Sequence, residues 1–202
     1  MDYYNDLITK KSWEELLSLK KLTDFMLIGG WAVYLYTKSL KSKDVDIIVN
    51  FDKLAILREK YEVTRNEKLK KYEARKDVVQ IDVYCPYYSN IGIPVEDLLK
   101  HVENIEGFSI VNINYLMALK IYTLAQRGRR PKGRKDLIDI ISLFLTNRID
   151  FVLVKKILKT YKLENHLQNL VVFLKENFEI LELGLNRHQF AKVKKDILGK
   201  IG

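Results

Sequence analysis

Apolar and polar residues in the first half of the chain alternate in short stretches of changing period. Residues 1–23 carry leucines at near-helical spacing, which predicts a helix. Apolar runs at residues 24–30 and 45–49, and an alternating run at residues 78–84, predict strands. Residues 31–38, between the first two runs, predict another helix. The first half is therefore predicted to mix helices and strands.

Four further segments are predicted in this half. They are a helix at residues 51–61, a loosely alternating segment at residues 67–75, a short helix at residues 94–100 and a turn followed by a strand at residues 105–111. The polar tripeptide at residues 75–77 is typical of a hairpin turn. Pro94 suits the first turn of the short helix, because proline lacks only an N–H group that would have no partner there.

From residue 114 onward, apolar side chains recur at the helical period of about 3.6 residues. The first of these helices leads into residues 127–135, which are rich in glycine, proline and basic residues and predict a loop. The helices that follow are predicted at residues 136–145, 150–162, 164–182 and 187–199. We expect an α+β fold with two domains, a sheet flanked by helices in residues 1–112 and an all-helical domain in residues 113–202 packed against it.

Composition excludes several classes of protein. Of the 202 residues, 48% are apolar and 30% are charged, which is ordinary for a soluble globular protein. No apolar run approaches the roughly 18 residues of a membrane span, and the N-terminus lacks the apolar core of a secretion signal. Cys85 is the one cysteine, so no intramolecular disulfide is possible. A cytoplasmic protein without a membrane partner is expected.

The net charge of +9 leaves two interpretations open. It favours polyanionic partners such as nucleic acid or nucleotides. A lysine-rich composition spread over solvated helix faces would give the same charge without such a partner. The basic residues at 127–135 share this ambiguity, since they form either a solvated loop or an element that steers RNA or NTP phosphates.

Two features near the first strands indicate chemistry. Gly29 and Gly30 end an apolar run at a strand-to-helix turn, where glycine lets backbone N–H groups approach an anion and the helix start adds a positive dipole end. Asp44 and Asp46 open the next strand two residues apart, so their carboxylates point to one face. Such a pair can hold a divalent metal and leave positions for phosphate oxygens.

Asp82 is a third acidic residue with an unusual position. It lies in the middle of the alternating strand at residues 78–84, where Ile81 and Val83 face a core and Asp82 faces the other way. A carboxylate in an apolar strand needs a partner, because an unpaired buried charge is costly. A metal shared with Asp44 and Asp46 would supply that partner, and a salt bridge to a neighbouring lysine or arginine would do so too.

The order of these motifs resembles the nucleotidyltransferase fold of the DNA polymerase beta superfamily. Within it, the sequence SKDVDI at residues 42–47 is similar to the signature of small prokaryotic nucleotidyltransferases, including those associated with toxin–antitoxin systems. Lys120, followed by RKDLID at residues 134–139, is similar to their helical motif. The resemblance covers roughly residues 25–145. It departs from the pattern at Leu40, where arginine is common.

The resemblance implies an enzyme that transfers a nucleoside monophosphate from an NTP, ATP foremost, to an acceptor and releases pyrophosphate. Two Mg²⁺ ions, or Mn²⁺, would be bound by the implied catalytic and metal-binding residues. These are Asp44, Asp46 and Asp82. Asp82 is alternatively the general base for the acceptor hydroxyl. The implied nucleotide-binding residues are Gly29, Gly30, Ser42 and Lys120.

The resemblance leaves the acceptor open between a partner protein, such as a toxin, and RNA, with a small molecule third. It also leaves open a catalytically inactive module that keeps the fold and binds a partner in the manner of an antitoxin. Asp136 and Asp139 share a helix face and are interpreted either as part of the motif or as a structural link to the basic segment. The oligomeric state is not addressed by any of these features.

Three tyrosines and one tryptophan carry further alternatives. Tyr84, Tyr87 and Tyr88 follow the strand that bears Asp82, and they are interpreted either as stacking partners for a base or as packing at the sheet edge. Trp31, directly after the glycine pair, is expected in the core.

Overall fold

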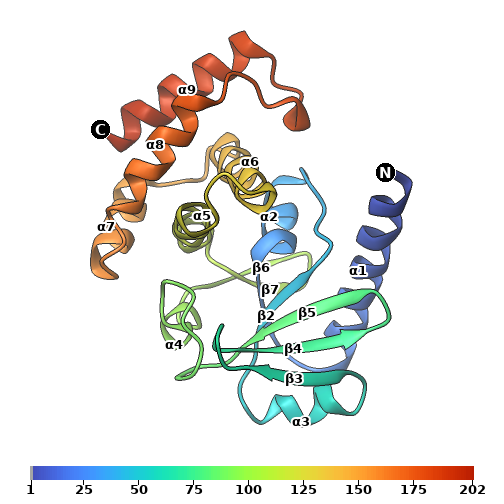
Figure 1. The fold of residues 1–202 in the computed structure, drawn as a ribbon. Helices are drawn as coiled ribbons and strands as arrows, with labels where there is room; N and C mark the ends of the chain where they lie inside the picture. The colour runs from blue at the N-terminus through green and yellow to red at the C-terminus, as the bar shows by residue number, and fades with distance from the viewer. Residues whose placement is uncertain (1) are drawn as a thin grey trace. The chain divides into compact units, whose positions relative to one another are not determined.

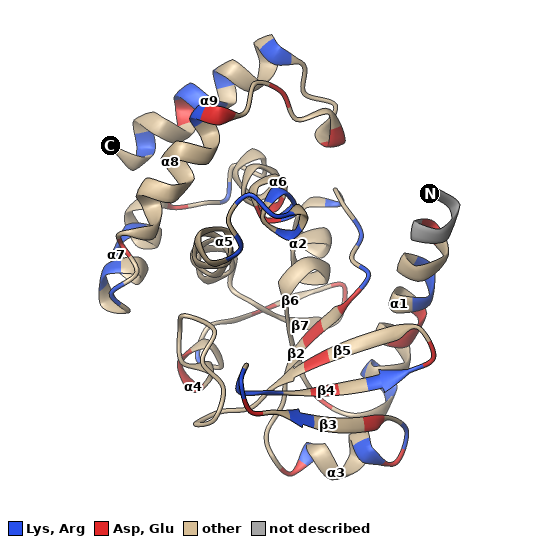
Figure 2. Cartoon of the chain, in the orientation of Figure 1, with Lys and Arg blue, Asp and Glu red and all other residues tan. Residues whose placement is uncertain are grey.

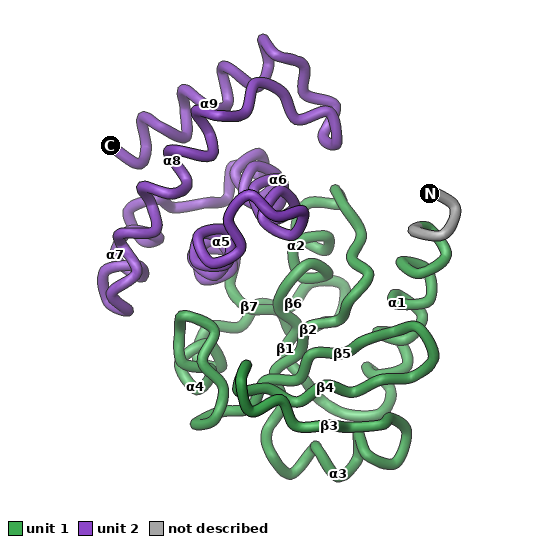
Figure 3. The backbone as a smooth tube through the Cα atoms, viewed as in Figure 1, with its two compact units in different colours: residues 1–112 green, residues 113–202 purple. Residues whose placement is uncertain are grey.

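The computed structural model describes residues 2–202, and in this range the chain divides into two compact units (Figure 3). The first unit ends at Asn112, and the second runs from Ile113 to Gly202. Helices and strands alternate in the first unit, whereas the second is helical (Figure 1). Within residues 2–202, every helix is too short or too polar to cross a lipid bilayer.

The strands described in the first unit form one mixed sheet. They are β1 (Met26–Ile28), β2 (Val45–Ile48), β3 (Glu62–Asn66), β4 (Lys71–Lys76), β5 (Val79–Tyr84), β6 (Val102–Ile105) and β7 (Phe108–Val111). Their order across the sheet is β3-β4-β5-β2-β1-β7-β6. The pairs β2–β5 and β1–β7 are parallel, and the other neighbouring pairs are antiparallel. The mixed sheet expected from the sequence is confirmed.

The helices fall into two groups along the chain. Those of the first unit are α1 (Asp2–Leu22), α2 (Gly29–Thr37), α3 (Lys53–Arg58) and α4 (Val95–Leu98). Those of the second are α5 (Ile113–Arg127), α6 (Pro131–Leu145), α7 (Phe151–Thr160), α8 (His166–Glu176), the 3₁₀ helix η1 (Leu181–Leu183) and α9 (Arg187–Ile201).

The core of the first unit explains which way each strand residue points. Ile81 and Val83 are fully buried, whereas Asp82 between them is half-buried. On β2, Ile47 is likewise fully buried and Asp46 is half-buried. Because side chains alternate between the two faces of a strand, the aspartates share the face opposite this apolar core. The predicted orientation of Asp82 is confirmed.

Two strands were not predicted, and both lie at the edges of the sheet. β3 and β6 have side chains that are exposed or half-exposed at every position. An edge strand is covered on fewer sides than a central one, so its sequence lacks the alternation of buried apolar residues that marks β5.

The predicted loop at residues 127–135 is wrong for more than half of its length. α5 continues to Arg127 and α6 begins at Pro131. Proline at the first position of a helix removes only an N–H group that has no intrahelical partner, so Pro131 starts the helix instead of preventing it. The helix predicted at residues 164–182 is shorter in the structure, because α8 ends at Glu176.

Candidate functional site

Gly29 and Asp46 meet where β1 passes into α2. Ile28, the last residue of β1, is paired with Asp46 on β2. Gly29 has a φ of +67°, and a Cβ atom at this position would lie 2.1 Å from Asp46 Oδ2. Only glycine fits here, because any other side chain would combine a strained backbone with a clash. The Asp46 carboxylate therefore lies against the first residue of α2.

The start of α2 has the properties of an anion-binding helix terminus. Ile28 precedes the helix and makes no side-chain capping hydrogen bond, and the first turn carries no acidic residue. The first N–H groups of a helix lack intrahelical partners and lie at the positive end of its dipole. Gly30 is buried in this turn, and Gly29 leaves the backbone bare on the side of Asp46. Both predicted glycines thus lie beside one of the predicted carboxylates.

Acidic residues from three neighbouring strands form one row across the sheet. Asp46 on β2 is in register with Asp82 on β5, and Asp82 is in register with Glu73 on β4. Neighbouring strands are about 4.8 Å apart, and residues in register point to the same face. The acidic segments of β2 and β5 lie next to each other in Figure 2. The structure therefore brings together two of the three predicted aspartates and adds a glutamate.

The Asp82 carboxylate has two donors. Lys71 Nζ lies 2.5 Å from Asp82 Oδ2, and Gln80 Nε2 donates to Asp82 Oδ1 over 2.8 Å. Lys71 Nζ is also 3.3 Å from Glu73 Oε1. A hydrogen bond from Asn66 and the positive charge of Lys71 hold the pKa of Glu73 below its usual value. The salt bridge considered for Asp82 is therefore present, and a metal shared with Asp44 and Asp46 stays a prediction.

Lys71 and Glu73 were not identified from the sequence as site residues. The alternation of residues 67–75 could have revealed them. Tyr72 and Ala74 are buried apolar residues, and Lys71 and Glu73 alternate with them and point to the opposite face. Alternation within one strand does not predict which strand pairs with it. The contact of Lys71 with Asp82 depends on the pairing of β4 with β5.

The carboxylates can be tested as a metal site. Asp44 directly precedes β2 and is half-buried, as is Asp46, and carboxylate oxygens suit Mg²⁺. Mg²⁺ typically takes one or two carboxylates and completes its shell with water and substrate phosphates. Among the side chains described, those of residues 6–202, no three acidic, histidine or cysteine groups are close enough to hold one ion together. An ion on Asp44 and Asp46, with nucleotide and water as the remaining ligands, stays a prediction.

Lys120 lies in an ionic cluster of the second unit. Its Nζ is 3.2 Å from Asp136 Oδ1 and 2.7 Å from Asp139 Oδ2, and its side chain is buried. Arg127 Nη1 donates to both oxygens of Asp136, at 3.1 and 2.9 Å. Asp136 on α6 thus binds both Lys120 within α5 and Arg127 at the end of α5. This agrees with the interpretation of Asp136 as a structural link to the basic segment. A contact between Lys120 and a triphosphate stays a prediction.

The basic segment at residues 127–135 is largely paired within the second unit. Arg129 donates to Glu176 on α8. Arg134 binds both carboxylate oxygens of Glu182 on η1, at 3.1 and 3.0 Å. These pairs connect the start of α6 and the residues before it to α8 and η1, while Arg127 connects α5 to α6. Much of the segment's positive charge is therefore paired with acidic residues of the same unit.

The aromatic residues near the site divide between core and surface. Trp31 is 1% exposed and donates from Nε1 to Ser12 Oγ over 2.8 Å, which confirms its place in the core. Tyr88 stacks on Tyr72 with ring centroids 5.4 Å apart, beside Arg65. Tyr87 is 88% exposed. Tyr88 therefore packs against the sheet edge, as one of the two interpretations expected.

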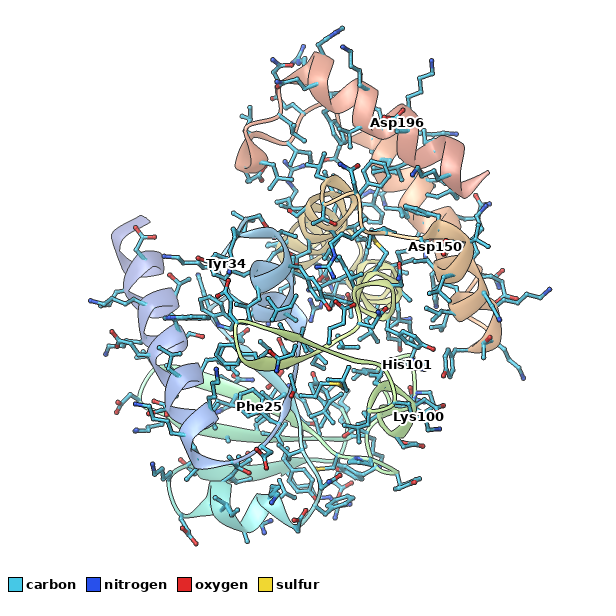
Figure 4. All side chains as sticks on the ribbon, turned by 180° about the vertical axis from the view of Figure 1, so that it is seen from behind. Phe25, Tyr34, Lys100, His101, Asp150 and Asp196 are labelled. Carbon is cyan, nitrogen blue, oxygen red and sulfur yellow. The ribbon has the colours of Figure 1, made fainter. Side chains whose placement is uncertain are left out.

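Lysines lie on either side of Leu40, the position where arginine is common in the family pattern. Lys38 forms an ion pair with Glu106, and Lys41 is exposed. Both line a pocket of about 520 Å³ between α1 and α2, on the side where Tyr34 faces α1 (Figure 4). Ser42, by contrast, is 4% exposed.

The fold as a whole is similar to two solved structures. An antigenic nucleotidyltransferase-like protein from Paracoccidioides brasiliensis superposes with a TM-score of 0.50 at 19% identity, over 94% of this chain and 93% of that chain. JHP933 from Helicobacter pylori superposes with a TM-score of 0.50 at 17% identity, over 95% of this chain and 94% of that chain. Neither a protein-family model nor a curated protein sequence matches this chain. The nucleotidyltransferase-like fold is thus confirmed.

Proposed function

We propose that this protein is a metal-dependent nucleotidyltransferase that transfers a nucleoside monophosphate from an NTP to a protein or RNA acceptor. The observation that carries the proposal is the meeting of three features at one point. The Asp46 carboxylate lies against Gly29 at the uncapped start of α2, and it is in register with Asp82 on the next strand. Phosphate-binding N–H groups and metal-binding carboxylates are the two requirements of phosphoryl transfer from a nucleotide.

In this proposal, Asp44 and Asp46 hold Mg²⁺, or Mn²⁺ in its place, against the triphosphate. The bound cation supplies positive charge that neutralises the phosphate oxygens as charge develops on them. The N–H groups at Gly29 and Gly30 bind phosphate oxygens at the positive end of α2, with the Ser42 hydroxyl as a further predicted contact. The nucleotide is thereby oriented with its α-phosphate toward the acceptor.

The transfer step forms one bond and breaks one. The acceptor hydroxyl oxygen bonds to the α-phosphorus, and the bond from that phosphorus to the β-phosphate oxygen breaks, so that pyrophosphate leaves. Asp82 takes the hydroxyl proton, since its carboxylate lies beside Asp46 in the row of acids. ATP is the proposed donor. The acceptor is a partner protein, as in a toxin–antitoxin pair, or the end of an RNA.

The test is transfer of label from an α-labelled NTP in the presence of Mg²⁺. Purified protein is incubated with each of the four NTPs and a cell extract, and labelled products are separated after protease or RNase treatment. We expect wild type to label a macromolecule and Asp44→Ala/Asp46→Ala to label none. Asp52→Ala is the matched control, because Asp52 is an exposed acid that forms an ion pair with its neighbour Lys53. Absence of label with all four NTPs would reject the proposal.

A second candidate is an inactive module that binds a partner through its helical unit. It is favoured by apolar side chains left exposed there, Val152 at 80%, Phe178 at 68% and Leu181 at 67%. Other apolar residues of these helices, including Ile157 and Leu170, are buried. Calorimetry separates the candidates, since the module predicts no heat when Mg²⁺ and millimolar NTP are added.

A further inference from the structure

The ion pair between Lys71 and Asp82 bears on how many metal ions the site takes. The Lys71 side chain is 8% exposed and that of Asp82 is 15% exposed, so the pair is shielded from solvent. Exposed ion pairs exchange readily with water and salt, whereas a shielded pair that loses one partner leaves an uncompensated charge. The ammonium group of Lys71 is therefore a fixed cation at Asp82.

Lys71 is held on its other side as well. Glu73, the next outward-facing residue of β4, accepts from Lys71 at 3.3 Å and from Asn66 Nδ2 at 2.9 Å. The low pKa of Glu73, caused first by the Asn66 hydrogen bond and then by Lys71, keeps this carboxylate ionised at neutral pH. A negative charge on each side of the ammonium group fixes its position between β4 and β5.

Both oxygens of Asp82 already have a donor. Lys71 takes Oδ2 and Gln80 takes Oδ1. A divalent ion bound through Asp82 would have to share an oxygen with one of these donors and lie beside a buried positive charge. Two cations bound to the same carboxylate repel each other strongly where water is excluded. The ion of the proposed function is assigned to Asp44 and Asp46, and Asp46 lies one strand away from Asp82 and its lysine.

We propose that Lys71 takes the place of a second divalent cation, so that this site binds one metal ion, on Asp44 and Asp46. Lys71 is then a positioning residue that holds Asp82 for the acceptor hydroxyl. This inference rests on the proposed function and replaces the two-metal arrangement that the family resemblance implies.

The test counts Mn²⁺ ions by electron paramagnetic resonance in the presence of a non-hydrolysable ATP analogue. We expect one Mn²⁺ per wild-type chain in the complex with the analogue, shared between the protein carboxylates and the triphosphate. We expect a second, weaker ion in Lys71→Met, because Asp82 and Glu73 then lack their cation. Two ions in wild type, or an unchanged count in Lys71→Met, would overturn the inference.

Two further variants keep the test sharp. Lys70→Met is the matched control, since Lys70 is the preceding lysine and makes an exposed pair with Glu67, and its Mn²⁺ count should equal that of wild type. Asp82→Asn serves if Lys71→Met does not fold, and its count should stay at one. A drop in Asp82→Asn would also overturn the inference. Complete absence of bound Mn²⁺ in wild type would instead reject the proposed function, which separates the two failures.

Discussion

Single residues at the start of α2 have no freedom to vary. Gly29 combines a left-handed backbone with a carboxylate in the space where a Cβ would be. Asp46 is held in the same place by its pairing with Ile28. A single methyl group added at Gly29 would therefore strain the backbone and displace the Asp46 carboxylate at the same time.

Gly29→Ala tests this constraint. We expect a loss of stability of about 1–3 kcal/mol, because alanine strains the positive φ and its Cβ collides with Asp46. If the proposed function holds, nucleotide transfer is lost as well, since Asp46 must move. Urea unfolding followed by circular dichroism gives the free energy.

Gly199→Ala is the control for Gly29→Ala. Gly199 lies within α9, and a Cβ there meets nothing within 4 Å. We expect this variant to gain roughly 0.5–1 kcal/mol, as alanine favours a helix over glycine. Equal effects of the two substitutions would contradict the clash with Asp46.

Cys85 is a buried thiol and should be inert in the native protein. It is 0% exposed, and burial raises the pKa of its thiol to about 11. Because the thiolate is the reactive form, we expect Ellman's reagent to label the native protein at least about 100-fold more slowly than the protein in guanidinium. Rapid labelling of one thiol per chain under native conditions would show that the residue is accessible.

The raised pKa of Cys85 also predicts a pH dependence of stability. The folded protein holds the thiol proton more tightly than the unfolded chain, whose thiol pKa is about 8.5. The contribution to stability is therefore complete below pH about 8.5 and is lost as the pH rises through about 11. Chemical denaturation at several pH values should show a smaller decrease for Cys85→Ala than for wild type.

At the scale of elements, the helices of the second unit are fixed by polar contacts at their ends. Asp136 near the start of α6 binds Lys120 and Arg127 of α5, while Asp150 caps the start of α7. Such contacts satisfy charges and N–H groups that helix formation leaves without partners. Each of them can be removed singly.

Asp136→Ala removes the shared partner of Lys120 and Arg127. We expect a loss of about 3–5 kcal/mol, because the buried ammonium of Lys120 loses a carboxylate that it shares with Arg127. Thermal unfolding by calorimetry measures the effect. The control is Asp196→Ala on the exposed face of α9, which should change stability by less than about 0.5 kcal/mol.

Asp150→Ala removes a helix cap. The Asp150 side chain accepts from the N–H groups of Val152 and Leu153, at 2.9 and 3.1 Å. We expect a loss of about 1 kcal/mol, the usual value of such a cap. Asn165 stands at the same position of α8 without a capping hydrogen bond, so Asn165→Ala should cost far less. Similar losses in both variants would argue against the cap at Asp150.

At the scale of the whole molecule, the net charge of +9 is distributed and not gathered at one element. Lysines and arginines occur on helices and strands of the first unit and on helices of the second (Figure 2). Several arginines of the basic segment are paired with acids. A distributed charge attracts polyanions without recognising a sequence.

Binding to single-stranded RNA should accordingly be weak and dependent on salt. For an unrelated RNA oligomer, we expect a Kd in the range of about 1–100 µM at physiological salt, with an affinity that falls steeply between 50 and 200 mM salt. Fluorescence anisotropy with oligomers of several sequences measures this. Tight binding of one sequence at high salt would identify a specific RNA site and with it the acceptor class.

Local periodicity was sufficient to predict the central parts of the fold. The alternation of β5 predicted that Ile81 and Val83 are buried and that Asp82 faces away, since a half-buried strand shows its orientation in its own residues. Gly29 at the start of α2 could be predicted for the same reason, because a positive φ is a local requirement. The edge strands β3 and β6 were not predicted, because partial exposure at every position removes the alternation of apolar and polar residues.

The sequence by itself determined which residues could carry the chemistry and on which face of its strand Asp82 lies. Only the tertiary structure decided that Asp46 is in register with Asp82, and that Lys71 is the partner of Asp82. Strand order and register arise from contacts between segments far apart in the chain, and no local pattern records them. The pairing of β4 with β5 sets Lys71 beside the Asp82 carboxylate, and this contact could not be predicted from the residues around Asp82 alone.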